Sequence, residues 1–206
     1  ENKNNVQINV RKDFVVTDKA DGLRMLLYIS KQGKMYFLNQ SMKIVFVGAA
    51  EQLTLKHCLI DGELITLKNT SVIGERWFAA FDIYYANNED IRALPFLLEK
   101  EKETNSKYRY QLLQQTMQQI GKEYVSLDSA SKIGWHTKEF YPKKETQTIF
   151  DGCSELFRQK FPYNTDGCIF THMSFGVGAM ENGKAGPLTK TTWGASFKWK
   201  PPQYNT

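Results

Sequence analysis

Lys19 is the first residue whose surroundings suggest covalent chemistry. It follows an apolar run that begins at Phe14, and it precedes Asp21-Gly22, a dipeptide typical of tight turns. Gly22 would let the backbone approach a ligand closely, and Arg24 could make planar contacts with phosphate or ribose oxygens. A lysine amine with an ordinary pKa near 10.4 is protonated at neutral pH. A nucleophilic role for Lys19 therefore requires nearby cations, a bound metal ion or desolvation.

Two further lysines near the end of the chain could supply positive charge. Lys198 and Lys200 flank Trp199 in the run FKWKPP, and a spacing of two places both side chains on one side of a strand. With Trp199 buried between them, the pair would suit a phosphate group. An ordinary solvent-facing side of a strand explains the same spacing, so the pattern alone does not decide between these interpretations.

Three carboxylates lie within or beside apolar runs, where water is scarce. They are Glu63, Asp82 and Asp166. A lone carboxylate is costly to bury unless it is paired with a cation or bound to a metal ion. Oxygen ligands of this kind suit Mg²⁺ or Mn²⁺.

The remaining pattern predicts an α+β fold. Apolar or alternating runs predict strands at residues 6–10, at 14–16, on both sides of a hairpin turn at Gln32-Gly33, and at IVFV, LIDGELI, WFAAFDIYY, CIFTH and SFKWK. Helical spacing predicts two helices between residues 89 and 124, separated near residues 104–106, and a third over residues 145–160. The glycine-rich stretch 173–192 predicts a loop or a flexible hairpin. Strands outnumber helices without regular alternation, which favours α+β over a doubly wound sheet.

Composition narrows the class of protein. The chain has 206 residues, 41% of them hydrophobic, and a net charge of +5, a moderate bias towards polyanions such as nucleotides or RNA. No apolar run approaches the roughly 18 residues of a membrane helix, so we expect no membrane partner. Three widely spaced cysteines form no disulfide framework and favour an intracellular setting.

Five motifs in order connect these residues to a known superfamily. KADGLR, DGELI, FAAFDIYY, TDGCIF and FKWKPP span residues 19–202. They resemble motifs I, III, IIIa, IV and V of the covalent nucleotidyltransferases, which include mRNA capping guanylyltransferases and ATP-dependent DNA and RNA ligases. The resemblance implies antiparallel sheets flanked by helices around a nucleotide pocket. Asp166 stands where ligases usually have Glu, and the tail KPPQYNT is also similar to capping enzymes.

The resemblance implies a role for each matching residue. Lys19 would attack the α-phosphate of GTP, form a lysyl-N–GMP phosphoamide and pass GMP to the 5′-diphosphate end of RNA. The nucleotide would be held by Arg24 and Glu63 at the ribose, Phe81 and Ile169 at the guanine, and Lys198 and Lys200 at the α-phosphate. Mg²⁺ or Mn²⁺ would be bound by Asp166 and Asp82.

The same resemblance sets expectations beyond this chain. We expect residues 1–206 to form one nucleotidyltransferase domain of a longer multifunctional protein, because the chain starts without Met. Family enzymes continue into a C-terminal OB-fold with a basic motif VI, which is absent from this chain, so the fragment alone is expected to be weakly active. Triphosphatase and methyltransferase domains would lie elsewhere in the same protein. The motif style is similar to capping enzymes of poxviruses and asfarviruses, which implies the host cytoplasm and the virion as locations.

Two other functions stay open. One is the adenylyltransferase domain of an ATP-dependent DNA or RNA ligase, which uses the same five motifs. The other is a catalytically silent module that keeps the fold and binds nucleotide or RNA.

Overall fold

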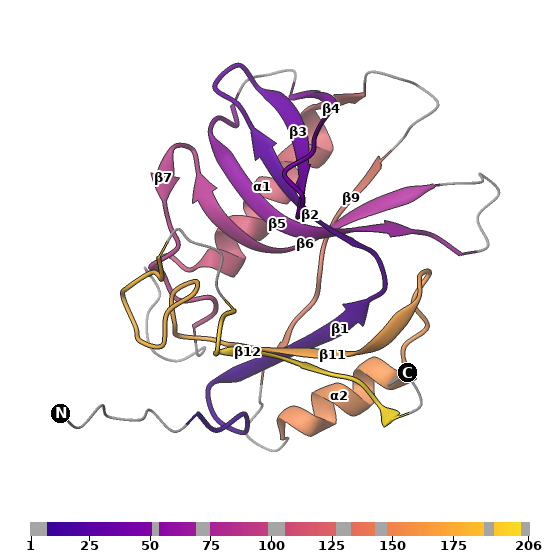
Figure 1. Ribbon diagram of the computed structural model, residues 1–206, viewed down its shortest axis with the longest axis vertical. Coiled ribbons are helices and arrows are strands. Elements are labelled where there is room, and N and C mark those ends of the chain that lie inside the picture. Colours follow the sequence, from indigo (N-terminus) through magenta and orange to yellow (C-terminus); the bar gives the residue numbers. More distant parts are fainter. Residues whose placement is uncertain are drawn as a thin grey trace.

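The chain forms two largely antiparallel sheets, each with one helix against one face (Figure 1). This arrangement is seen in a computed structural model, which describes residues 8–50, 54–68, 75–98, 106–126, 133–142, 148–187 and 192–202. The two sheets lie one above the other in Figure 1, with α1 beside the upper sheet and α2 beside the lower one.

The smaller sheet has the strand order β10-β1-β11-β12. Its strands are β1 (Phe14–Ala20), β10 (Tyr141–Pro142), β11 (Thr165–His172) and β12 (Ser196–Trp199). Helix α2 (Ile149–Arg158) packs on this sheet through Ile149, Cys153 and Leu156. A capping box between Thr148 and Asp151 satisfies the free N–H groups at its start.

The larger sheet has the order β7-β6-β5-β2-β3-β4-β8, and β9 pairs with β6 in parallel. Its strands are β2 (Leu23–Ile29), β3 (Lys34–Asn39), β4 (Ile44–Ala50), β5 (Cys58–Thr66), β6 (Arg76–Ala86), β7 (Glu89–Asp90), β8 (Tyr124–Ser126) and β9 (Ile133–Thr137). Helix α1 (Arg109–Glu123) covers one face of this sheet. The apolar side chains Leu113, Met117 and Ile120 of α1 join the core formed by Leu27, Phe37 and their neighbours.

The stretch KADGLR connects the two sheets. Lys19 lies in β1 of the smaller sheet, and Arg24 lies in β2 of the larger one. Gly22, between the strands, has no room for a side chain, because a Cβ there would lie 2.7 Å from Leu64 O and 2.8 Å from Glu63 Cγ. The glycine thus permits close approach of β5, whereas the sequence suggested close approach of a ligand.

Most predicted strands are confirmed, as are the hairpin turn at Gln32-Gly33 and the helices that became α1 and α2. Residues 173–187 form a loop with a single isolated bridge, as predicted for this part of the stretch. The strand predicted over residues 6–10 is wrong at residues 8–10, which form no strand, and Val6 lies outside the described residues.

The helix predicted from Glu89 is wrong over residues 89–98, because Glu89–Asp90 form β7 and residues 91–98 are turns and irregular structure. Pro95 explains the difference, because proline lacks an N–H donor and its ring clashes with the carbonyl of the preceding helical turn. Asp90 also turns the chain by accepting hydrogen bonds from the backbone and guanidinium of Arg92. The rest of that prediction, residues 99–103, lies outside the described residues. Neither α1 nor any other helix in the described ranges combines the length and apolar character needed to cross a bilayer.

Candidate active site

Asp166, near the start of β11, contacts two lysine amines at one end of the smaller sheet. Lys19 Nζ lies 2.7 Å from one carboxylate oxygen, and Lys200 Nζ lies 2.7 Å from the other. Desolvation opposes ionisation of Asp166, but the hydrogen bonds from Lys19 and Lys200 outweigh it and lower the pKa of the carboxyl group. The structure thus brings together three of the five motifs: Lys19 of KADGLR and Lys200 of FKWKPP both contact Asp166 of TDGCIF.

Strand pairing explains how Lys200 reaches this position. β12 runs beside β11, with Cys168 opposite Trp199 and Ile169 opposite Lys198. Gly167 allows the close approach, because its φ is +152° and a Cβ there would lie 2.0 Å from Trp199 O. A side chain at position 167 would push β12 away, and with it Lys200, which directly follows the strand.

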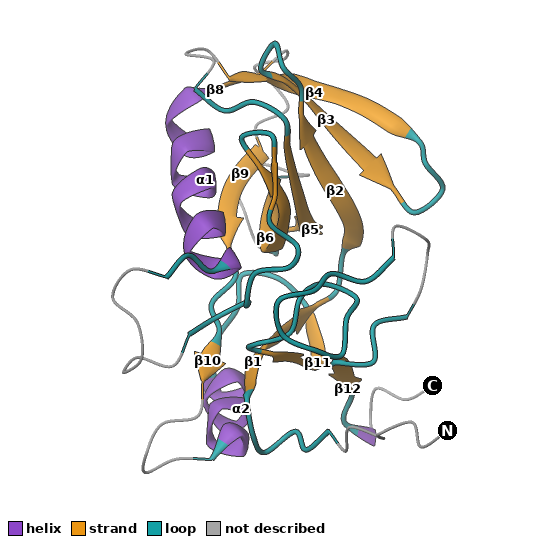
Figure 2. Ribbon diagram, turned by 90° about the vertical axis from the view of Figure 1, so that its left-hand side faces the viewer, coloured by secondary structure: helices purple, strands orange, loops and turns teal. Residues whose placement is uncertain are grey.

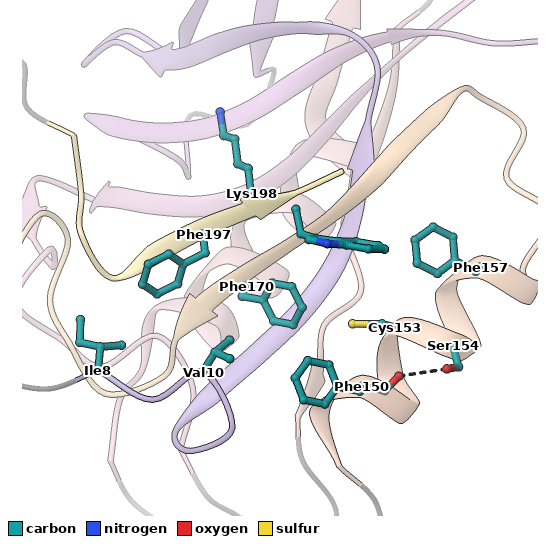
Figure 3. Close-up of a pocket in the computed structure, with 10 residues that line it drawn as sticks. Ile8, Val10, Phe150, Cys153, Ser154, Phe157, Phe170, Phe197 and Lys198 are labelled. Atoms are coloured by element: carbon teal, nitrogen blue, oxygen red, sulfur yellow. Dashed lines mark hydrogen bonds between the residues drawn. The ribbon is translucent and has the colours of Figure 1, made fainter. Parts of the chain in front are cut away.

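Lys198 lies on the same face of the smaller sheet as Ile169, since the two residues are opposite each other in antiparallel strands. Figure 3 shows the Lys198 amine pointing away from Phe170 and Phe197, which lie on the other side of β12. The charge of Lys198 acts on Glu63 of the larger sheet. Lys198 is therefore directed to the space between the two sheets.

Glu63 occupies the larger sheet opposite this group of lysines. It is partly buried and pairs across the strands with Arg24. Desolvation raises the pKa of Glu63, opposed by the charges of Lys138, Lys19 and Lys198. The carboxylate therefore lies within electrostatic reach of amines from three separate segments.

Arg24 is oriented by a carboxylate that the sequence did not mark as functional. Its Nε and Nη2 donate to the two oxygens of Asp61 at 3.0 and 2.5 Å, and Asp61 is fully buried. Tyr84 donates a further hydrogen bond to Asp61. The guanidinium carbon of Arg24 lies 5.9 Å from the ring centroid of Phe81, which brings the predicted base-stacking residue to the same sheet face.

Lys138, a buried lysine near the candidate nucleophile Lys19, was not identified from the sequence. Its side chain is 3% exposed, its amine donates to the backbone oxygen of Asp18 at 2.5 Å, and it lies 3.0 Å from Asp18 Oδ2. Burial lowers the pKa of Lys138, opposed chiefly by the charge of Asp18. A lysine in the polar run HTKEF is ordinarily exposed, so only tertiary structure could identify it.

Asp82 is not brought to the lysines. Arg109, fully buried at the start of α1, donates to the two Asp82 carboxylate oxygens at 2.8 and 3.2 Å. The backbone N–H of Ile83 donates to Asp82 as well. Arg109 also donates to Leu94 O and to Phe175 O, so this ion pair fastens α1 to two loops. The carboxylate that the sequence marked as costly to bury is thus paired with a cation.

The metal-ion prediction depends on Asp166. Among the described residues, no three His, Cys, Asp or Glu side chains gather into a metal-binding group. Mg²⁺ in nucleotide sites is commonly bound by one or two carboxylates together with substrate phosphates. Asp166, with a side chain 19% exposed between two amines that suit phosphate, fits such a shared site.

An apolar pocket of about 760 Å³ lies behind β12, on the side opposite the Lys198 amine (Figure 3). It is lined by Phe150 and Phe157 of α2 and by Phe170 and Phe197 of the sheet. Trp199 also lines it and is 46% exposed, so the expectation that this ring is buried is wrong. Lys198 contributes to the lining as well, but its amine points to the opposite side of β12, so the pocket does not contain the lysine amines of the candidate active site.

Comparisons with known proteins agree with this geometry. The family model described as "mRNA capping enzyme, catalytic domain" matches residues 2–202. An mRNA-capping enzyme subunit alpha from Neurospora crassa is 25% identical over 95% of this chain, which spans about half of that relative, 48% of its length.

Solved structures show the fold. The ligase domain of ligase D from M. tuberculosis matches with a TM-score of 0.52 and 13% identity, over 91% of this chain and 53% of that one. A mycobacterial DNA ligase D complexed with ATP and MES matches with a TM-score of 0.51 and 13% identity, over 91% and 54% of the two chains. At this identity the likeness concerns the fold alone, which is that of a nucleotidyltransferase domain, as the motifs predicted.

Proposed function

The chain belongs to the family of mRNA capping enzyme catalytic domains, and on that premise we propose that it is an mRNA guanylyltransferase. It would form a covalent lysyl-N–GMP intermediate from GTP and transfer GMP to the 5′-diphosphate end of RNA. The observation that supports this proposal is the placement of two amines, those of Lys19 and Lys200, on the two oxygens of Asp166. One amine is a candidate nucleophile, and the other is a cation for the phosphate under attack.

The proposed reaction has two steps. The Lys19 nitrogen attacks the α-phosphorus of GTP, an N–P bond forms, and the P–O bond to the β-phosphate breaks to release pyrophosphate. The Lys19 amine donates to Asp166 Oδ1 at 2.7 Å and must lose a proton before it attacks. A cation bound by Asp166 and the neighbouring amines of Lys198 and Lys200 would favour the neutral amine. An oxygen of the RNA diphosphate then attacks the phosphorus, the N–P bond breaks, and Lys19 regains a proton.

The other residues would bind and orient the nucleotide. Lys198 and Lys200 would stabilise negative charge on the α-phosphate. Arg24, which is held by Asp61, and Glu63 would contact the ribose. Phe81 of the larger sheet and Ile169 of the smaller sheet would contact the guanine base. Asp166 would bind Mg²⁺ or Mn²⁺, which when bound neutralises charge on the phosphates.

The proposed partners extend to a longer protein. A C-terminal OB-fold would add basic contacts to the β- and γ-phosphates, and triphosphatase and methyltransferase domains would act on the RNA before and after GMP transfer. An intracellular location accompanies this proposal. The poxvirus or asfarvirus source predicted from motif style stays a prediction, and the relative from Neurospora crassa is fungal.

The decisive experiment is nucleotide labelling. The chain, or a longer protein that contains it, is incubated with GTP or ATP labelled at the α-phosphate, with Mg²⁺ or Mn²⁺, and covalent label is measured after denaturation. We expect label from GTP alone, removed by acid and retained in alkali, as for a phosphoamide. Label from ATP alone would contradict guanylyl transfer and favour the ligase function, whose solved structures share this fold.

A further inference from the structure

An aromatic row crosses the larger sheet on the face turned away from α1. Tyr28, Tyr36 and Phe46 lie opposite one another in β2, β3 and β4. The ring centroids of Tyr28 and Tyr36 are 6.5 Å apart, and those of Tyr36 and Phe46 are 5.3 Å apart. Phe46 is 39% exposed, and the two tyrosines are partly exposed.

This row lies outside the core. Alternation along β2 and β3 sends Leu27, Ile29 and Phe37 to the face covered by α1, where they are buried. The rings of the aromatic row point to the opposite face. Figure 2 shows α1 on one side of β2, β3 and β4, and no helix of the described residues against the other side.

The aromatic row shares its sheet face with the candidate active site. Along β2, Arg24 and Tyr28 are four residues apart, so their side chains point to the same face. At about 3.4 Å per residue, roughly 14 Å of strand separates them. Leu26, Leu38 and Ile44 lie opposite one another between the site and the aromatic row. The surface is therefore continuous from the arginine of the site to the rings.

The charge of this region is one-sided. Residues 22–50, which contain β2, β3 and β4, include four basic residues and no acidic one. Lys34 lies two residues before Tyr36 and on the same face, and Lys31 and Lys43 lie in the adjoining turns. All three lysines are exposed. The same sheet face continues into β5, where Glu63 lies opposite Arg24 and the buried Asp61 is paired with Arg24, so the three exposed lysines supply the positive charge of the region. Exposed lysines of this kind complement a polyanion.

We propose that this face, the aromatic row with its flanking lysines, binds the single-stranded 5′ segment of the RNA that receives GMP. Unpaired bases stack on aromatic rings with little regard to sequence, while lysines contact the phosphates. The exposed rings and the positive charge together favour a single-stranded nucleic acid over an apolar partner. The orientation of the RNA, with its 5′ end at Lys19, rests on the proposed function.

The test uses variants that keep apolar bulk but remove the aromatic faces. Tyr36→Leu combined with Phe46→Leu is compared with Phe157→Leu, a change of an exposed ring on α2. Affinity for a short single-stranded RNA with a 3′ fluorophore is measured by anisotropy. We expect the double variant to bind about tenfold or more weakly, and the control to bind as the wild type.

The lysines are tested by salt dependence. For single strands, log K falls against log salt with a slope of about −0.7 for each phosphate that the protein neutralises. Lys34→Ala should make the slope shallower by about this amount, whereas Lys184→Ala, an exposed lysine paired with Glu181, should not. A chain without measurable RNA affinity, or a double variant within twofold of the wild type, would overturn the proposal.

Adduct formation with GTP separates this proposal from the proposed function, because that step needs no RNA. We expect the double variant to form the lysyl–GMP adduct as the wild type does, which also shows that it is folded. Its transfer of GMP to RNA should require about tenfold more RNA. If the chain formed no adduct while its RNA affinity still depended on the two rings, the guanylyltransferase function would fail and the RNA surface would stand.

Discussion

The amine of Lys19 and the carboxylate of Asp166 lie 2.7 Å apart, although 147 positions separate them in the chain. β1 and β11 are adjacent antiparallel strands, with a register shift between Asp18 and Ala20 at the level of Lys19. The shift marks an irregularity of the kind often found beside active sites, where it redirects a side chain. The contact thus depends on the local geometry of two strands that each contribute one motif.

Replacing Lys19 tests the nucleophile. Lys19→Arg keeps a cation beside Asp166 but cannot form the proposed phosphoamide, so covalent label from GTP should fall below detection. Thermal unfolding should change little, because the ion pair with the partly exposed Asp166 can re-form. Lys184→Ala serves as the control for removal of an exposed lysine. Undiminished labelling of Lys19→Arg would exclude this residue as the attacking group.

Asp166 and Asp82 should respond differently to the metal ion. Asp166→Asn should raise the Mn²⁺ concentration for half-maximal labelling at least about tenfold, because the proposed ligand is removed. Asp82→Asn should leave that concentration unchanged but lower the free energy of unfolding by about 3–5 kcal/mol, because Arg109 is left buried without its anion. The measurements are metal titrations of adduct formation at low temperature and urea unfolding.

Asp82→Asn could instead change the Mn²⁺ concentration for half-maximal labelling at a temperature where the variant is folded. That result would support the prediction that Asp82 binds the metal ion together with Asp166. The matched change at Asp166 makes this comparison possible, since both substitutions remove one negative charge and keep the shape of the side chain.

Glu63 should give a pH-dependent stability. Its pKa in the folded protein is raised above the ordinary value of 4.5, chiefly by desolvation. Its contribution to folding is therefore fully present below pH 4.5 and is lost as the pH rises through the raised pKa. Glu63→Gln should consequently unfold at a higher temperature than the wild type at pH 7, and the difference should shrink towards pH 4. Thermal unfolding across this range checks the sign, and a difference that grows on acidification would contradict it.

Local patterns were sufficient to predict most strands and the motif residues. The hairpin at Gln32-Gly33 and the buried face of α2 each follow from a spacing that operates within a dozen residues. The failure after Glu89 is instructive, since Ile91 and Leu94 have helical spacing but Pro95 prevents the helix. In this segment the helical spacing arises because Ile91 and Leu94 each pack against the core of the larger sheet from an irregular loop.

The site was predictable only where motifs marked it. Asp61 and Lys138 escaped because their roles depend on partners distant in the chain, Arg24 for one and Asp18 for the other. A buried carboxylate such as Asp82 has two physical solutions, a metal ion or a cation, and the sequence could not choose between them. Arg109, which decides the matter, lies 27 positions away in a helix whose position depends on tertiary packing.

Lys138 and Asp18 form a buried pair directly before the nucleophile, and their coupling can be measured. Lys138 directs its hydrogen bond to the backbone oxygen of Asp18, while Asp18 Oδ2, at 3.0 Å, has no well-aligned hydrogen bond. The attraction at that oxygen is therefore mainly one of charge. Lys138→Met should lower the free energy of unfolding by about 3–5 kcal/mol, because it leaves a buried carboxylate unpaired.

Asp18→Asn added to Lys138→Met should recover part of that stability, since the unpaired charge is then removed. The double-mutant cycle should show a coupling of about 1–3 kcal/mol in urea unfolding. Labelling with GTP should be slow in Lys138→Met, because the backbone oxygen of residue 18, directly before Lys19, then loses its hydrogen bond. Asp18→Asn keeps that bond and should slow labelling less. A coupling near zero would mean that the two residues stabilise the fold independently, and the positioning of Lys19 would then rest on Asp166 alone.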